Sequence, residues 1–288
     1  MINTNNIERI TSKDLIRLSY IHGIKNSFIP SEHWWNKAEK WFFVVFNRNN
    51  PLTYGSVNPE LKLIWDSKED LVNYLKNCKL IFYGWGAGET ETALIDSLLE
   101  KNDNIEVIAV DVNEDFINMF NHSMNLLKKE NHKIEYKGYI GRFQELKSNH
   151  LDFNNSRFKN KNHIILGNLV ANMEEEIIKV ISNLSEENNY LTIGFNTPKH
   201  INIILDKIKE SKYFNNFVIS EEDSKKNIKW SIKNNTLIAE YDGIMRFTSK
   251  LYNPEELENI CLKYRLKKVY EKLDENRHSC IQIYQKLN

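Results

Sequence analysis

A short run of glycines constrains the fold of this chain more than any other feature. The apolar segment Leu80–Tyr83 leads directly into Gly84-Trp-Gly-Ala-Gly88, and a helical pattern follows from Glu89 to Glu100. Glycine allows a sharp backbone turn and lets a ligand approach the main chain closely. A strand, a glycine-rich turn and a helix in this order favour an α/β fold that binds a nucleotide-like ligand at the turn.

The alternation of strand and helix continues for about a hundred residues, which predicts a parallel sheet with right-handed crossovers. The expected strands after the first are Ile105–Val110, Lys133–Tyr139, His163–Leu166 and Asn189–Phe195, and the expected helices are Asn113–Lys129 and Met173–Leu184.

The last third of the chain has a different pattern. Three short strands over residues 228–247 are separated by Asn234-Asn235 and Asp242-Gly243, which are typical of hairpin turns. They predict a β-meander. A helix over residues 253–264 and two antiparallel strands, Leu266–Leu273 and Ser279–Gln285, are expected to close the chain.

The first 78 residues lack this mononucleotide pattern. Residues 31–46 are rich in aromatics and predict a helix, and Trp34 and Trp35 belong either to a lid over a substrate or to a core. Residues 47–55 predict a loop and Ser67–Leu75 a helix. We therefore expect an N-terminal helical cap (1–78), a Rossmann-like domain (79–199), an inserted cap segment (200–250), and a C-terminal helix with antiparallel strands (251–288) that complete a seven-stranded sheet.

Composition excludes several classes of function. The 288 residues carry 39 Lys and Arg against 39 Asp and Glu, so the basic excess of a dedicated nucleic-acid binder is missing. Cys78, Cys261 and Cys280 are widely spaced, which favours a reducing, cytoplasmic setting. We expect no signal peptide, no membrane span and no metal site.

The glycine turn also indicates the kind of ligand. Glu89 follows the last glycine, and an acid at the start of a helix would repel a pyrophosphate, whereas a nucleoside that carries a sulfonium tolerates it. Asp111 ends the second strand about 25 residues after the turn, where a carboxylate can accept both ribose hydroxyls. The alternative for Asp111 is a helix cap or a solvated strand end.

Two further turns lie at the same edge of the predicted sheet. Phe143, after the third strand, belongs either to a wall against an adenine or to the core. Asn168 and Asn172 follow the fourth strand, where ligands of such sheets bind and where an amide suits a zwitterionic amino acid. Asn172 is equally suited to capping the next helix.

From Leu80 to about Ser185 the chain resembles class I S-adenosylmethionine-dependent methyltransferases, and within them the histidine-specific family of the ergothioneine pathway. The resemblance rests on four segments: Tyr83-Gly-Trp-Gly-Ala-Gly-Glu89, Val110-Asp-Val-Asn-Glu-Asp-Phe116, Gly141-Arg-Phe-Gln-Glu-Leu146 and Leu166-Gly-Asn-Leu-Val-Ala-Asn-Met173. It implies S-adenosylmethionine as cofactor. The candidate cofactor-binding residues are Gly84, Trp85, Gly86, Gly88, Asp111, Val112, Arg142, Phe143, Asn168 and Leu169.

The resemblance also implies a substrate site, with departures. The family's substrate-binding Asn falls on Asn172, and its substrate-recognising Glu falls near Arg246, so the charge is reversed. Arg246 would suit a carboxylate. Thr248 lies two residues further along the same strand, so both are expected on one face of it. Phe82 and Arg142 stand where the family usually has acids, and residues 1–78 do not match its N-terminal motif. Histidine as substrate therefore does not carry over.

These observations predict methyl transfer from S-adenosylmethionine to a small amino-acid-like or carboxylate-bearing molecule, with N-methylation favoured. One alternative is an aminocarboxypropyl transferase, because residues 168–184 also resemble nicotianamine synthases. The other is a non-catalytic protein on the same fold. No catalytic residue is assigned, although Tyr54, Tyr83, His200 and His278 are candidates for a general base.

Overall fold

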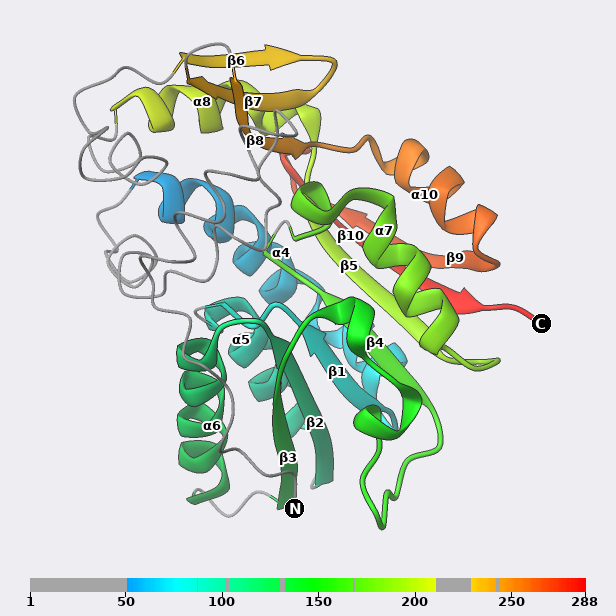
Figure 1. The fold of residues 1–288 in the computed structure, drawn as a ribbon. Coiled ribbons are helices and arrows are strands. Elements are labelled where there is room, and N and C mark those ends of the chain that lie inside the picture. Colours follow the sequence, from blue (N-terminus) through cyan, green and yellow to red (C-terminus); the bar gives the residue numbers. More distant parts are fainter. Residues whose placement is uncertain are drawn as a thin grey trace, which may run out of the picture.

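The computed structural model describes residues 51–86, 88–101, 104–129, 133–167, 169–210, 229–241 and 244–288. It confirms the predicted Rossmann-like sheet (Figure 1). Seven strands lie in the order β3-β2-β1-β4-β5-β10-β9. The first five strands in this order are parallel to one another, and β10 pairs antiparallel with both β5 and β9.

The boundaries of the observed strands and helices of the Rossmann-like sheet differ from the expected boundaries by a few residues at most. The strands are β1 (Lys79–Tyr83), β2 (Asn104–Asp111), β3 (Lys133–Ile140), β4 (Lys161–Ile165), β5 (Tyr190–Asn196), β6 (Lys229–Lys233), β7 (Thr236–Tyr241), β8 (Ile244–Lys250), β9 (Leu266–Leu273) and β10 (Ser279–Lys286). The helices are α4 (Pro51–Leu75), α5 (Glu89–Leu99), α6 (Glu114–Lys129), α7 (Leu169–Leu184), α8 (Ile201–Glu210) and α10 (Pro254–Lys263), with short 3-10 turns η1 (Phe143–Glu145), η2 (Ser148–Leu151) and η3 (Pro198–His200).

Helices cover both faces of the sheet, so the central strands β1, β4 and β5 are buried along almost their whole length. Every residue of β1 is buried, as expected for a parallel strand packed on both sides. One apolar cluster joins the sheet to α4, α5 and α6, and a second joins the opposite face to α7 and α10. Because β1 leads into α5 on one face and β4 leads into α7 on the other, the chain changes direction between these neighbouring strands. Ligands of open α/β sheets bind at such a switch point, beyond the carboxyl ends of the strands.

Helix α4 differs from the sequence-based prediction. Residues 51–55 were expected in a loop and the helix from Ser67, but the described chain forms one helix from Pro51 to Leu75, with Pro59 inside it. Pro51 suits the first turn, where its missing N–H costs no helical hydrogen bond. Burial of Leu63, Ile64, Leu71 and Leu75 against the sheet and α5 stabilises the helix beyond Pro59.

The predicted meander is present as a separate three-stranded sheet, β6-β7-β8. Figure 1 shows it, together with α8, beyond the carboxyl ends of the parallel strands. Strand β8 runs to Lys250, three residues further than expected, and contacts α7. The pairing of β8 with β7 shifts register at Arg246, so the simple alternation that put Arg246 and Thr248 on one face does not hold across this irregularity.

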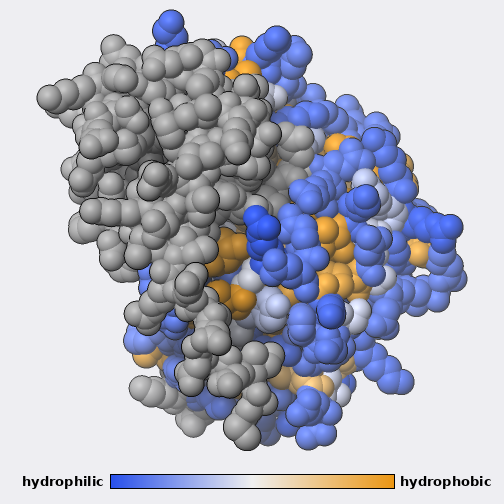
Figure 2. All heavy atoms as spheres, viewed as in Figure 1, coloured by the Kyte–Doolittle hydropathy of each residue, from blue (hydrophilic) through white to orange (hydrophobic). Residues whose placement is uncertain are grey.

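The three cysteines are buried free thiols. Among the described residues, no helix combines the length and apolarity needed to cross a bilayer, and no group of three or more metal-ligating side chains occurs. On the face drawn in Figure 2, hydrophilic residues predominate in the coloured surface and apolar residues gather near its centre.

Candidate functional site

The glycine turn lies at the switch point, and glycine is required at its positions for two different physical reasons. Gly84, Gly86 and Gly88 have φ values of 69°, 55° and 72°, a left-handed conformation that other residues adopt at a cost. A Cβ on Gly88 would overlap the indole of Trp85, so packing requires this glycine. A Cβ on Gly86 would meet no atom within 4 Å, so this position leaves open space above the backbone.

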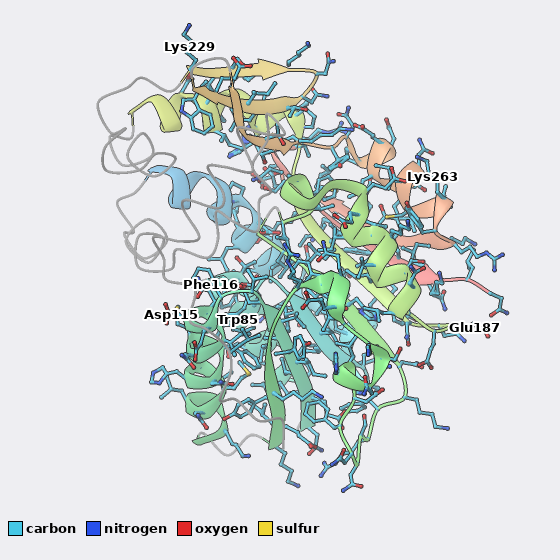
Figure 3. All side chains as sticks on the ribbon, viewed as in Figure 1. Trp85, Asp115, Phe116, Glu187, Lys229 and Lys263 are labelled. Carbon is cyan, nitrogen blue, oxygen red and sulfur yellow. The ribbon has the colours of Figure 1, made fainter. Side chains whose placement is uncertain are left out.

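The side chain of Trp85 belongs to the core, so only its backbone is available at the glycine turn. The indole is 1% exposed and lies edge-on to Phe82 and Phe120, with ring centroids 5.5 and 4.8 Å apart. Figure 3 labels Trp85 near Phe116, at the end of the sheet where β1 and β2 finish. Phe82 therefore completes an aromatic core at the position where an acid was expected from the resemblance.

Asp111 ends β2 and is joined to the glycine turn by hydrogen bonds. The carboxylate is buried and accepts the N–H groups of Asn113 at 2.9 Å and Gly86 at 3.4 Å. Burial raises the pKa of Asp111 to about 6, while hydrogen bonds from four backbone N–H groups in residues 85–86 and 112–113 lower it. An acid held in this way remains able to accept further hydrogen bonds, because a carboxylate has about four acceptor positions.

The turn after β3 is tied to the same end of β2, since Gly141 N–H donates to the carbonyl of Asp111 at 2.9 Å. Val112 is half-buried and Arg142 is exposed. Phe143 is buried and packs edge-on against Tyr83, with centroids 5.5 Å apart. This contact makes Phe143 part of the core. The expected contact of Phe143 with an adenine stays a prediction.

The turn after β4 lies beside the glycine turn. The side chain of Leu169 is half-buried and reaches within 2.8 Å of the point where Gly84 would carry a Cβ. Asn172 lies in the first turn of α7, which begins at Leu169. Asn168, the side chain of Asn172 and the side chain of Arg246 lie outside the described residues, as do Trp34 and Trp35.

The structure also reveals a carboxylate that the sequence analysis missed. Glu60, on α4, is 2% exposed and accepts the N–H of Gly167 at 2.9 Å, at the start of the β4 turn. Two signals in the sequence could have found it. Glu60 falls on the apolar stripe of α4 that continues through Ile64 and Leu71, and Gly194 lies in the interior of a predicted strand.

The candidate general bases have different surroundings. The Tyr83 hydroxyl and Nδ1 of His163 lie 2.8 Å apart in the core; burial raises the pKa of Tyr83 and lowers that of His163 to about 3. The rings of His200 and His278 lie 5.1 Å apart between η3 and the start of β10, and His200 is buried. The side chain of Tyr54 lies outside the described residues. These contacts give Tyr83 a structural role and assign no base.

The residues at the switch point fit a nucleoside cofactor. Gly86 leaves space for a ligand against the backbone, and the buried carboxylate of Asp111 borders that space. A seven-stranded sheet with an antiparallel β10, a glycine turn after β1 and an acid at the end of β2 defines the class of S-adenosylmethionine-dependent methyltransferases.

A comparison with models of known protein families supports this class and identifies the family within it. The model of the histidine-specific, S-adenosylmethionine-dependent methyltransferase family matches residues 26–218, and the chain belongs to this family. The match includes residues 26–78, in which the sequence alone showed no family motif. No curated protein matches the chain.

Solved structures share the fold at low sequence identity. Magnesium protoporphyrin IX methyltransferase from Synechocystis, crystallised with S-adenosylhomocysteine, has a TM-score of 0.55 and 10% identity, over 89% of this chain and 98% of that one. A protein from Pyrococcus horikoshii has a TM-score of 0.50 and 17% identity, over 85% of this chain and 98% of that one.

Proposed function

We propose that this methyltransferase acts on a small molecule that carries an amino group and a carboxylate, and that it methylates the nitrogen. The observation that carries the proposal is the packing of β8 against α7. Asn172 lies in the first turn of α7, and Arg246 and Thr248 lie on β8. An amide on one side and a guanidinium on the other suit an amino-acid-like acceptor.

The cofactor supplies an electrophilic methyl group on a positively charged sulfur. We propose that Gly84, Gly86 and Gly88 receive the nucleoside and that Asp111 accepts the ribose hydroxyls, with Trp85, Val112, Arg142, Phe143, Asn168 and Leu169 around them. The protein's contribution to the reaction is to align the nucleophile with the methyl group and to exclude water. We assign the exclusion of water to residues 200–250, whose described part lies beyond the carboxyl ends of the strands (Figure 1).

Replacing Asp111 tests the ribose contact. Asp111→Ala should weaken S-adenosylmethionine binding by ~1–3 kcal/mol, because the ribose hydroxyls lose a buried acceptor. Isothermal titration calorimetry on both proteins measures the difference, and thermal melting checks that the variant is folded. Equal affinities in two folded proteins would remove Asp111 from the site.

Replacing Arg246 tests the carboxylate contact. Arg246→Ala should raise the substrate KM by about tenfold or more and leave cofactor affinity unchanged, because a charge-assisted hydrogen bond contributes ~1.5–3 kcal/mol to ground-state binding. Lys233→Ala, on the exposed end of β6 in the same small sheet, is a matched control that should leave KM unchanged. An unchanged KM in Arg246→Ala would mean that Arg246 is a solvated strand residue with no role in binding the substrate.

A screen of acceptors tests the substrate class. The protein is incubated with S-adenosylmethionine and pools of amino acids and their derivatives, and in parallel with tRNA and with protein extracts. We expect turnover with a small-molecule pool. Turnover with a macromolecule and with no small molecule would contradict the proposal.

A further inference from the structure

Glu60 occupies a position that the sheet is built to accommodate. Its Oε2 and Oε1 accept the N–H of Gly167 at 2.9 and 3.2 Å. On the neighbouring strand β5 the facing residue is Gly194, and a Cβ there would overlap Oε1 of Glu60. The carboxylate is therefore held between the end of β4 and a strand that lacks a side chain at this point.

The charge of Glu60 receives little compensation from the part of the chain that the structure describes. Within the described residues, no Lys, Arg or His side chain forms an ion pair with Glu60, and its hydrogen bonds come from Gly167. Burial raises the pKa of Glu60 to about 7, and the Gly167 hydrogen bond lowers it in part. A buried acid with so little compensation is costly, and such groups concentrate at functional sites.

The strand order relates this carboxylate to the cofactor. The nucleoside is assigned to the turns after β1, β2 and β3, and β1 lies next to β4. The amino-acid end of the cofactor must then extend away from β2, toward the β4 turn where Gly167 holds Glu60. That end carries an α-ammonium group, and a buried carboxylate is its natural partner.

We propose that Glu60 binds the α-ammonium group of the cofactor's amino-acid end. This inference rests on the proposed placement of the nucleoside between the glycine turn and Asp111. Helix α4 thereby supplies a negative charge to the crevice that β1 lacks, since its five residues are Lys-Leu-Ile-Phe-Tyr. Glu60 acts as a binding residue, and the ammonium supplies a positive charge that no described side chain places beside this carboxylate.

The test compares two ligands that differ by this ammonium group. One is S-adenosylhomocysteine; the other is 5′-(3-carboxypropyl)thioadenosine, which lacks the amine. Isothermal titration calorimetry on the full chain should show that wild type prefers S-adenosylhomocysteine by about tenfold to a hundredfold. In Glu60→Gln, which keeps an oxygen for Gly167, the preference should fall to about threefold or less. Asp111→Ala is the control, and it should weaken both ligands by the same factor.

The outcomes separate this inference from the proposed function. Wild type that binds neither ligand would overturn both. Wild type that binds both ligands, together with a folded Glu60→Gln that keeps the full preference, would overturn the role of Glu60 alone. If Glu60→Gln does not fold, Gly194→Ala gives the same test, because its Cβ takes the place of the carboxylate; an unchanged preference in that variant would overturn the inference.

Discussion

Gly86→Val is expected to abolish S-adenosylmethionine binding while the protein remains folded. A Cβ at Gly86 meets no protein atom within 4 Å, so the valine side chain would project into the space assigned to the nucleoside. We expect a loss of at least about a hundredfold in affinity, which corresponds to about 2.7 kcal/mol. Isothermal titration calorimetry measures the loss, and thermal melting measures the fold.

The left-handed backbone at Gly86 requires a control for strain. Asn188 has φ 65° at an exposed turn between α7 and β5, at the opposite end of the sheet. Asn188→Val introduces the same β-branched residue at a similar φ, so it should cost comparable stability and leave binding intact. Micromolar binding by Gly86→Val would mean that the glycine turn is not the cofactor site.

Glu60→Gln is expected to stabilise the unliganded protein at pH 8 by roughly 2–3 kcal/mol and to have little effect near pH 4. The pKa of Glu60 is about 7 in the folded protein, above the usual value of 4.5 for a glutamate, because the carboxylate is buried. Between these pKa values the folded state holds a proton that the unfolded state has released, so wild-type stability falls as the pH rises from about 4.5 to about 7. Glutamine does not titrate, so the Glu60→Gln variant does not lose this stability as the pH rises.

Urea unfolding of both unliganded proteins at pH 4, 6 and 8 measures the effect. Burial is the dominant cause of the raised pKa, and no charged side chain on the described parts of α5, α8, β5 or β10 contributes to it. Glu106→Gln is the control. That buried acid accepts hydrogen bonds of 2.6 Å from Ser156 and from the Arg157 N–H, so its replacement should destabilise the protein. Glu60→Gln less stable than wild type at pH 8 would contradict the prediction.

The sheet could be predicted from the sequence because its signals are local. The glycine turn, Asp111 at the end of an apolar strand, and the Asn234-Asn235 hairpin turn each specify a backbone conformation within a few residues. These segments fold as their own sequence favours, and tertiary packing agrees with that preference. The two antiparallel strands that complete the seven-stranded sheet followed from the pattern of the last third of the chain together with the family resemblance.

Helix α4 and Glu60 could not be predicted in this way. Pro59 indicates a break in the helix. Burial of α4 against β5, β10 and α5 outweighs it, and these contacts are distant in sequence. The burial of Glu60 depends on Gly194, 134 positions away, facing it across the interface between helix and sheet. The register shift at Arg246 arises from pairing with β7, so two-residue alternation along β8 could not reveal it.

The by-product of turnover tests the central claim most directly. The protein is supplied with S-adenosylmethionine that carries a deuterated methyl group and with an acceptor pool that supports turnover, and both products are identified by mass spectrometry. Methyl transfer to a small molecule predicts S-adenosylhomocysteine and an acceptor heavier by one labelled methyl group. Release of methylthioadenosine, which marks transfer of the aminocarboxypropyl arm, or recovery of the label in a macromolecule would contradict the account.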